Sequence, residues 1–231
     1  MSKHLTCLSS MATRQLLADL GAAFLQRHGI AVATESVGGV DAARRVQAGE
    51  RFGLVVLASD AIDKLIAGGH LQAGSRVDLV RSPVALAVRH GAARPDLGSE
   101  ASLKQAVRAA RSIGFSTGPS GTFLMQLFER WGIVAQVQDR IVQAKPGVPV
   151  ASLVASGEVE LGFQQLAELL NVDGVDVVGT LPEGAAFITT FSAGLCPGPA
   201  DAGVAPWLAF LNSPEAAEVK RRHGMQPARE A

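Results

Sequence analysis

Short apolar runs and amphipathic segments alternate along almost the whole chain. Residues 4–8 read as a strand, and Leu16, Leu20 and Phe24 then recur every fourth residue, as on one face of a helix that ends at Gly29. The alternation continues with strands at 30–34 and 54–58 and helices at 40–49 and 60–69. Continuous apolar strands joined by helices are typical of a parallel sheet covered on both faces, so the pattern predicts a βαβαβ lobe.

Residues 77–91 break this pattern, because they form one long β-rich segment with Pro83 inside it. Proline cannot donate to a strand ladder, so we expect the strand to break or to change sheets there and to cross into a second lobe. The alternation then resumes, with helices expected at 102–110, 122–132, 148–157 and 165–170 and strands at 112–116, 140–144, 159–163 and 175–179.

A last apolar strand at 186–195 is expected to return to the first lobe, where helices at 205–213 and 214–224 pack. Crossovers near 80–84 and 187–192 would form a hinge. The predicted fold is therefore α/β with two lobes, mixed sheets flanked by helices and two crossover strands. Lobe one comprises 1–81 and 190–231, and lobe two comprises 82–189. A single continuous doubly wound sheet is the alternative.

The turns between strands and following helices are built mainly of serine, threonine, glycine and amide side chains. Ligands of open parallel sheets bind at the carboxyl ends of the strands, where helix starts offer free N–H groups to anions. Each turn taken singly is also explained by ordinary helix capping, yet their shared composition favours a binding crevice between the lobes. The turns are 8–13, 35–40, 58–61, 115–122, 144–149 and 163–166.

The turn at 116–122, with the sequence STGPSGT, is the most suggestive of them. It resembles a phosphate cradle but lacks the lysine of the nucleotide-binding P-loop, so a nucleotide site is not expected. Ser120, Gly121 and Thr122 are candidate anion donors, and a glycine-rich turn with Ser120 as a helix cap is the alternative.

Composition narrows the choice of partner. The 21 basic residues equal the 21 acidic ones, so no overall field attracts nucleic acid or an acidic membrane, and no apolar run is long enough to span a bilayer. Cys7 and Cys196 lack metal-type spacing and are expected to be free thiols, a disulfide being the alternative. No sequence motif for a metal or a catalytic nucleophile is present, and no cofactor is expected.

Few titratable residues fall at or near these turns. Arg81 at the first crossover could pair with a carboxylate, although a solvated surface arginine is an equal alternative. Glu35 and Lys145 are the candidate bases, with a surface role for Lys145 as the alternative.

Three stretches carry a resemblance to a known family: LSSMATRQLLADLGAAF, RRVQAGERFGLVVLASDAIDKLIAGG and SLVASGEVELGFQQLAELL. In order along nearly the whole chain, they resemble the molybdate-type substrate-binding proteins of bacterial ABC transporters. The resemblance implies the type 2 periplasmic-binding-protein fold and a small anionic ligand, an oxyanion or an organic carboxylate.

The family's ligand loops fall, by position, on residues in both predicted lobes. The chain departs from the molybdate binders, since it has no tyrosine near position 165 and has Gly38-Gly39-Val40 where they have a serine-rich loop. The residues that the resemblance implies as ligand-binding are Ser9, Ser10, Gly38, Gly39, Ala58, Ser59, Ser120, Gly121, Thr122, Gly147, Val148 and Gln165.

A branch of the same family contains aconitate isomerases, which implies a second function, the isomerisation of an unsaturated polycarboxylate. Such a reaction needs a base near a carbon-bound proton and donors for the developing enolate. The start MSKHLTCLSS runs into a strand without the apolar stretch of a secretion signal, so we expect a cytoplasmic protein. If a signal has been removed, a periplasmic location and an ABC-transporter permease as partner are expected instead.

Overall fold

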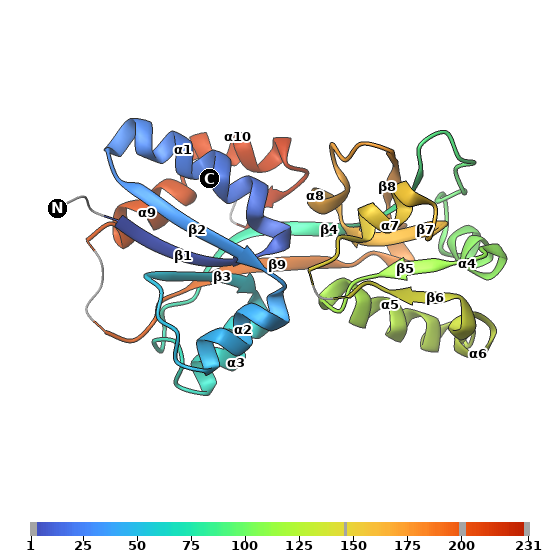
Figure 1. The fold of residues 1–231 in the computed structure, drawn as a ribbon, viewed down its shortest axis with the longest axis horizontal. Helices are drawn as coiled ribbons and strands as arrows, with labels where there is room; N and C mark the ends of the chain where they lie inside the picture. The colour runs from blue at the N-terminus through green and yellow to red at the C-terminus, as the bar shows by residue number, and fades with distance from the viewer. Residues whose placement is uncertain (1–3, 146, 199–201, 229–231) are drawn as a thin grey trace. The chain divides into compact units, whose positions relative to one another are not determined.

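The computed structural model describes residues 4–145, 147–198 and 202–228, and the chain forms two compact units (Figure 1). Unit 1 comprises Met1–Ser82 and Thr190–Ala231, and unit 2 comprises Pro83–Thr189. The predicted lobe boundaries, after residues 81 and 189, lie within one residue of these. The chain passes from one unit to the other twice, in strands β4 (Val77–Arg89) and β9 (Ile188–Gly194).

Unit 1 is built on three parallel strands in the order β2–β1–β3, followed by antiparallel β9. They are β1 (His4–Ser10), β2 (Ala31–Val37) and β3 (Leu54–Ala58). The short β10 (Gln226–Pro227) pairs antiparallel with β4 at Arg81 and Val80. Because β1, β2 and β3 run the same way, their last residues lie at one edge of the sheet.

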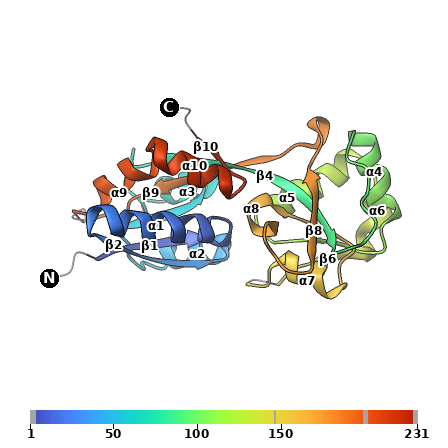
Figure 2. The ribbon, with the colours of Figure 1, turned by 90° about the horizontal axis from the view of Figure 1, so that it is seen from above.

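Helices cover both faces of this sheet (Figures 1 and 2). One face carries α1 (Arg14–His28), which follows the 3-10 turn Met11–Thr13, together with α9 (Val204–Leu211) and α10 (Pro214–Arg222). The other carries α2 (Gly39–Gln47) and α3 (Ser59–Ala67). The rings of Phe24 and Trp207 pack at a tilt in the first layer, with centroids 4.9 Å apart, and Val46, Leu57 and Ile62 are buried together in the second. Each apolar helix stripe is thereby buried, which is the main stabilising contribution of such a layer.

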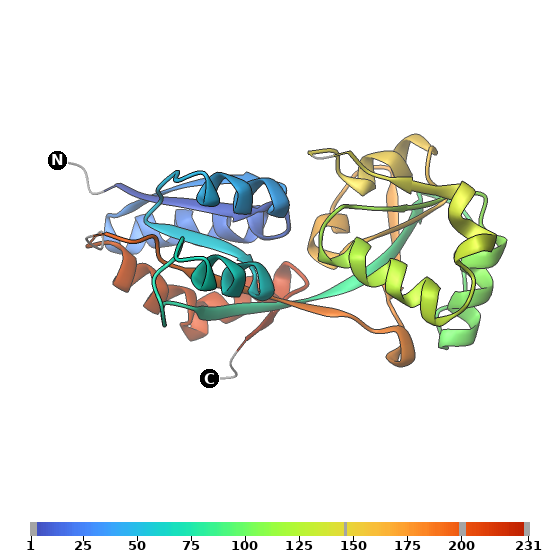
Figure 3. The same cartoon turned by 90° about the horizontal axis from the view of Figure 1, so that it is seen from below.

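Unit 2 has three parallel strands in the order β7–β5–β6, with β4 antiparallel beside β7 (Figure 3). The strands are β5 (Ile113–Phe115), β6 (Ile141–Gln143), β7 (Leu161–Gln165) and β8 (Val175–Thr180), the last pairing with β4. The helices are α4 (Glu100–Ala109), α5 (Pro119–Arg130), α6 (Val134–Val137), α7 (Val150–Ser156) and α8 (Leu166–Leu169), with 3-10 turns at Gln138–Arg140 and Glu183–Ala185.

The core of unit 2 lies between its sheet and the helices α4 and α5. Phe115 and Phe163 from the strands pack with Leu103, Leu124 and Phe128 from these helices, and all five are buried. This burial fixes where α5 starts relative to the strand ends, which matters for the candidate site.

Most predicted elements are present, with shifts at their ends. Strand β4 changes sheets at Pro83 as predicted, but it remains one continuous strand instead of breaking. Helix α5 begins at Pro119 instead of residue 122, because proline suits the first turn of a helix. The helix predicted at 165–170 is only Leu166–Leu169, since Gln165 still belongs to β7.

Candidate functional site

The predicted residues of unit 1 gather at the carboxyl ends of its three parallel strands. Ser9 and Ser36 sit opposite each other in the β1–β2 register, and their hydroxyl oxygens are 2.7 Å apart. Gly39 lies against Ser10, because a Cβ on Gly39 would stand 3.9 Å from the Cβ of Ser10. The structure therefore brings the turns after β1 and β2 together, as the parallel order requires.

Two nine-residue helices of unit 1 start at this edge without a side-chain cap. The flanking residues are Gly38 before α2 and Ala58 before α3, and neither has a side chain that can accept from the first N–H groups. Uncapped N–H groups at a helix start carry partial positive charge and attract anions. Gly38, Gly39, Ala58 and Ser59 therefore flank two uncapped helix starts, and their role in ligand binding stays a prediction.

The hydroxyl groups of the two serines of β1 differ in their hydrogen bonds. Ser9 is fully buried, and its hydroxyl lies 2.7 Å from Ser36 and 3.3 Å from the Ser10 carbonyl oxygen. Among the described residues, the Ser10 hydroxyl has a single hydrogen-bond contact, a long one of 3.5 Å to the Thr13 hydroxyl. Ser10 is the better donor to a ligand, and Ser9 is better explained as a tie between the two strands.

In unit 2 the predicted donors lie in the turn between β5 and α5. Ser120 is 2% exposed, and its hydroxyl oxygen is 3.5 Å from that of Ser116. The N–H groups of Gly121 and Thr122 both already donate to the Gly118 carbonyl oxygen, at 3.0 and 3.2 Å. The amide and hydroxyl of Ser120 are therefore the stronger candidates, and the exposed Thr122 is a weaker one.

The remaining turns of unit 2 are less open than the sequence indicates. Val148 donates its N–H to the Lys145 carbonyl oxygen at 2.9 Å, and the Val150 N–H at the start of α7 is capped by Oε1 of Gln164 at 3.1 Å. Gly147 has φ +80°, a conformation that suits glycine in this turn. Gln165 ends β7 and is buried.

The predicted titratable residues lie on the surface. Glu35 takes two hydrogen bonds from the Arg45 guanidinium, and these bonds hold the pKa of its carboxyl below the usual value. Arg81 is exposed on β4 opposite Gln226. Lys145 is exposed and makes no ion pair within the described part of the chain. Of the two predicted bases, Glu35 is therefore the one with a charged partner among the residues that the structure describes.

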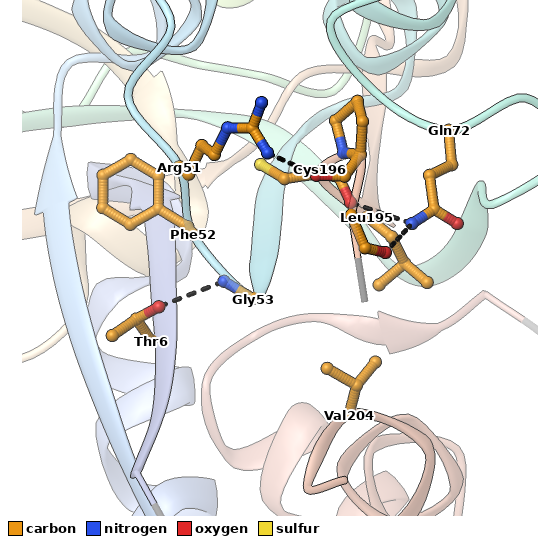
Figure 4. Close-up of a pocket in the computed structure, with 10 residues that line it drawn as sticks. Thr6, Arg51, Phe52, Gly53, Gln72, Leu195, Cys196 and Val204 are labelled. Atoms are coloured by element: carbon orange, nitrogen blue, oxygen red, sulfur yellow. Dashed lines mark hydrogen bonds between the residues drawn. The ribbon is translucent and has the colours of Figure 1, made fainter. Parts of the chain in front are cut away.

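A separate cavity of about 280 Å³ opens in unit 1 (Figure 4). Its wall includes Thr6, Arg51, Gln72 and Cys196, with Arg51 and Gln72 donating to backbone carbonyl oxygens at 3.1 and 2.9 Å. Gly53 precedes β3, so this cavity lies at the edge of the sheet where β3 starts, away from the predicted ligand turns. None of the predicted ligand-binding residues lines it.

The two cysteines are free thiols, as predicted. Burial raises the pKa of the Cys7 thiol to about 12, so it stays protonated and unreactive. Within residues 4–145, 147–198 and 202–228, no cluster of three or more histidine, cysteine or acidic side chains could hold a metal. None of the helices in that same range is long and apolar enough to cross a bilayer.

Thr189 is a functional candidate that sequence reasoning missed. Gln165 Nε2 donates to the buried Thr189 Oγ1 at 2.7 Å. The available signals were a pair of glutamines directly after an apolar strand and a pair of threonines inside the apolar strand 186–195. Their partnership depends on tertiary contacts, which no local pattern specifies.

Comparison with known proteins agrees with this fold. At 34% identity, an aconitate isomerase of a Pseudomonas species aligns over 96% of this chain and 87% of its own. The periplasmic molybdate-binding protein of Azotobacter vinelandii superposes with a TM-score of 0.79 at 22% identity, covering 96% of this chain and 98% of its own. The sulfate-binding protein SubI of Mycobacterium tuberculosis gives 0.77 at 16% identity, covering 98% and 87%.

These neighbours confirm the predicted two-lobed type 2 periplasmic-binding-protein fold and the resemblance to molybdate-type binding proteins. The family model described as "Bacterial extracellular solute-binding protein" matches residues 5–226. The chain therefore belongs to the family of bacterial extracellular solute-binding proteins.

Proposed function

We propose that this protein binds a small organic polycarboxylate. The observation that carries the proposal is the set of uncharged donors at parallel strand ends: uncapped α2 and α3 with Ser10 in unit 1, and Ser120 at the start of α5 in unit 2. Carboxylate oxygens are good acceptors for such donors. The choice of a polycarboxylate over an inorganic oxyanion is supported by the relative named aconitate isomerase, which is 34% identical to this chain.

A thermal-shift series tests this proposal. Di- and tricarboxylates, with molybdate, tungstate and sulfate beside them, are added to the purified protein at several concentrations. A ligand present at 100 times its dissociation constant adds about 2.7 kcal/mol to the free energy of unfolding, which gives a clear rise in melting temperature. A rise with the carboxylates is expected. A rise with the inorganic oxyanions alone, or with none of the compounds, would contradict the proposal.

A second candidate function is the isomerisation of an unsaturated polycarboxylate, favoured by the identity and coverage of the same relative. The neutral amine of Lys145 would take the carbon-bound proton and return it to the other end of the allylic system. The Ser120 amide and hydroxyl would donate to the developing enolate oxygen. Proton NMR of cis- or trans-aconitate, with a catalytic amount of the protein in deuterated water, tests this second function. An isomerase is expected to interconvert the two compounds, with or without loss of the exchangeable proton signal. If a compound binds but its spectrum stays unchanged, the protein binds it without isomerising it.

The partner that the family implies is the permease of an ABC transporter, if the protein is exported. We infer this partner from the family alone. This partner requires export, and fractionation of cells that produce the natural full-length protein tests for export. A protein found only in the cytoplasm could not deliver ligand to such a permease.

A further inference from the structure

Two adjacent glutamines end strand β7, and only one of them has its hydrogen bonds complete. Gln164 and Gln165 are both 3% exposed. Successive side chains of a strand point to opposite faces of the sheet, so the two amides serve different surroundings. The hydrogen bonds of the two amides show which one has a structural role and which one lacks a partner.

Gln164 is fully used within unit 2. Its Oε1 accepts from the Val150 N–H at 3.1 Å, and its Nε2 donates to Glu168 Oε1 at 2.8 Å. It therefore ties β7 to the start of α7 and to α8, and no atom of its amide needs a ligand.

Gln165 is used at one atom only. Nε2 donates to Thr189 Oγ1 at 2.7 Å, whereas Oε1 is buried and accepts from no group in the described part of the chain. A buried carbonyl oxygen without a donor is unfavourable, and such atoms are rare in native structures. Oε1 therefore marks a place where a donor from outside the chain would be stabilising.

The position of Gln165 connects this oxygen with the candidate site. Gln165 shares a face of the sheet with Phe163, two residues before it, and Phe163 packs with Leu124 and Phe128 of α5. Gln165 is the last residue of β7, and α5 starts at the same end of the parallel strands (Figures 1 and 3). The unpaired oxygen thus lies on the α5 side of the sheet, at the end where Ser120 begins that helix.

We propose that Gln165 Oε1 accepts a hydrogen bond from an O–H group of the bound ligand. Thr189 is the positioning residue, because its hydroxyl holds Nε2 and so orients Oε1 towards the ligand. This inference rests on the proposed function. The neighbouring candidate groups of unit 2, the amide and hydroxyl of Ser120, can both donate, whereas a carboxamide oxygen can only accept. Oε1 of Gln165 therefore selects ligands that bring a proton. The ligand class is a carboxylic acid with an O–H group, either a hydroxyl or one carboxyl that stays protonated when bound.

Titration calorimetry with citrate and tricarballylate, which differ by one hydroxyl group, distinguishes the two sources of the proton. If the hydroxyl is the donor, citrate binds about tenfold more tightly than tricarballylate at pH 7.5. If the acid proton is the donor, tricarballylate binds with uptake of one proton, measured in buffers of different ionisation enthalpy. Equal affinities without proton uptake would overturn the inference.

Variants at Thr189 test the positioning role. Thr189→Val keeps the shape of the side chain but cannot accept from Nε2, and we expect it to lose the citrate preference or the proton uptake. Thr189→Ser keeps the hydroxyl and should therefore keep the ligand preference or proton uptake of the wild type. A merely structural role for Thr189 would change the melting temperature of the free protein and leave the ligand preference as in the wild type.

The matched control is the neighbouring amide. Gln164→Met removes two internal hydrogen bonds and should lower the melting temperature while it leaves the ratio of citrate to tricarballylate affinity unchanged. Should the wild type bind neither compound nor any other carboxylate, the proposed function falls and this inference with it. If the wild type binds and Thr189→Val keeps the same preference, only the inference is wrong.

Discussion

The side-chain nitrogen of Lys220 donates to the backbone carbonyl oxygen of Leu79 at 2.9 Å, which ties helix α10 to the strand that leads into unit 2. Lys220 is 2% exposed and makes no ion pair among the residues that the structure describes. Burial therefore lowers the pKa of its ammonium group to about 8. A lysine that loses its proton near neutral pH makes stability depend on pH.

The first prediction concerns this dependence. Between pH 8 and 10.5 the unfolded chain keeps a proton on Lys220 that the folded protein releases, so the free energy of unfolding should rise with pH, by up to roughly 3 kcal/mol. Urea denaturation at pH 7, 8 and 9 measures it. Lys220→Met should abolish the rise, whereas Lys64→Met, at a side chain that is 78% exposed, should leave it. A rise that persists in Lys220→Met would refute the assignment.

Cys7 predicts the opposite trend at higher pH. Its thiol has a pKa of about 12 in the fold against a usual 9.0, so above pH 9 the unfolded chain loses a proton that the folded protein keeps. The contribution of Cys7 to the free energy of unfolding should therefore fall as pH rises from 9 towards 12, and up to pH 10.5 it opposes the rise that Lys220 contributes. Cys7→Ala should remove this fall, although the lost sulfur costs about 1 kcal/mol at every pH. Denaturation of both proteins at pH 8, 9 and 10 checks it, and parallel curves would count against it.

The alternation of apolar strands and helices was enough to predict the architecture, because each element has to bury one face against a neighbour. Pro83 is instructive, since the sequence left open whether the strand breaks or changes sheets there, and the structure keeps it as one strand. A proline inside β4 still adopts extended φ, and only its missing N–H limits pairing. Sequence identifies the missing donor, whereas tertiary context decides whether the strand continues.

The candidate site was less predictable. Residues such as Ser10 and Gly39 come together because parallel strands end at one edge, which follows from the fold. The identity of the free donors does not follow from it, since hydrogen bonds within the turns use up the N–H groups of Gly121, Thr122 and Val148. These bonds depend on the residue at which α5 starts and on the backbone conformation of each turn. A shift of one residue would change which N–H groups are free.

A glycine in the 116–122 turn gives a test of that closure. A Cβ on Gly121 would stand 1.9 Å from the Ser116 carbonyl oxygen, so the backbone would have to move, whereas on Gly118 the nearest atom is Ser116 Oγ at 3.5 Å. Gly121→Ala should cost about 1–3 kcal/mol and weaken ligand binding, because Ser120 shifts. Gly118→Ala should stay within about 0.5 kcal/mol of the wild type.

Melting temperatures and carboxylate titrations of the two alanine variants decide this prediction. Equal effects at both positions would mean that general flexibility of the turn matters, and that the close approach at Gly121 does not.

The last prediction separates the two candidate bases, should the wild type isomerise aconitate. The Arg45 guanidinium holds both oxygens of Glu35 and lowers the pKa of its carboxyl, which makes it a weaker base. Lys145 has no ion-pair partner among the described residues. Lys145→Met should therefore slow proton exchange from aconitate by about 100-fold or more, whereas Lys64→Met, a surface control, should not. A comparable loss in Glu35→Gln with full activity in Lys145→Met would transfer the role to Glu35, and it would require the ion pair with Arg45 to open when substrate binds.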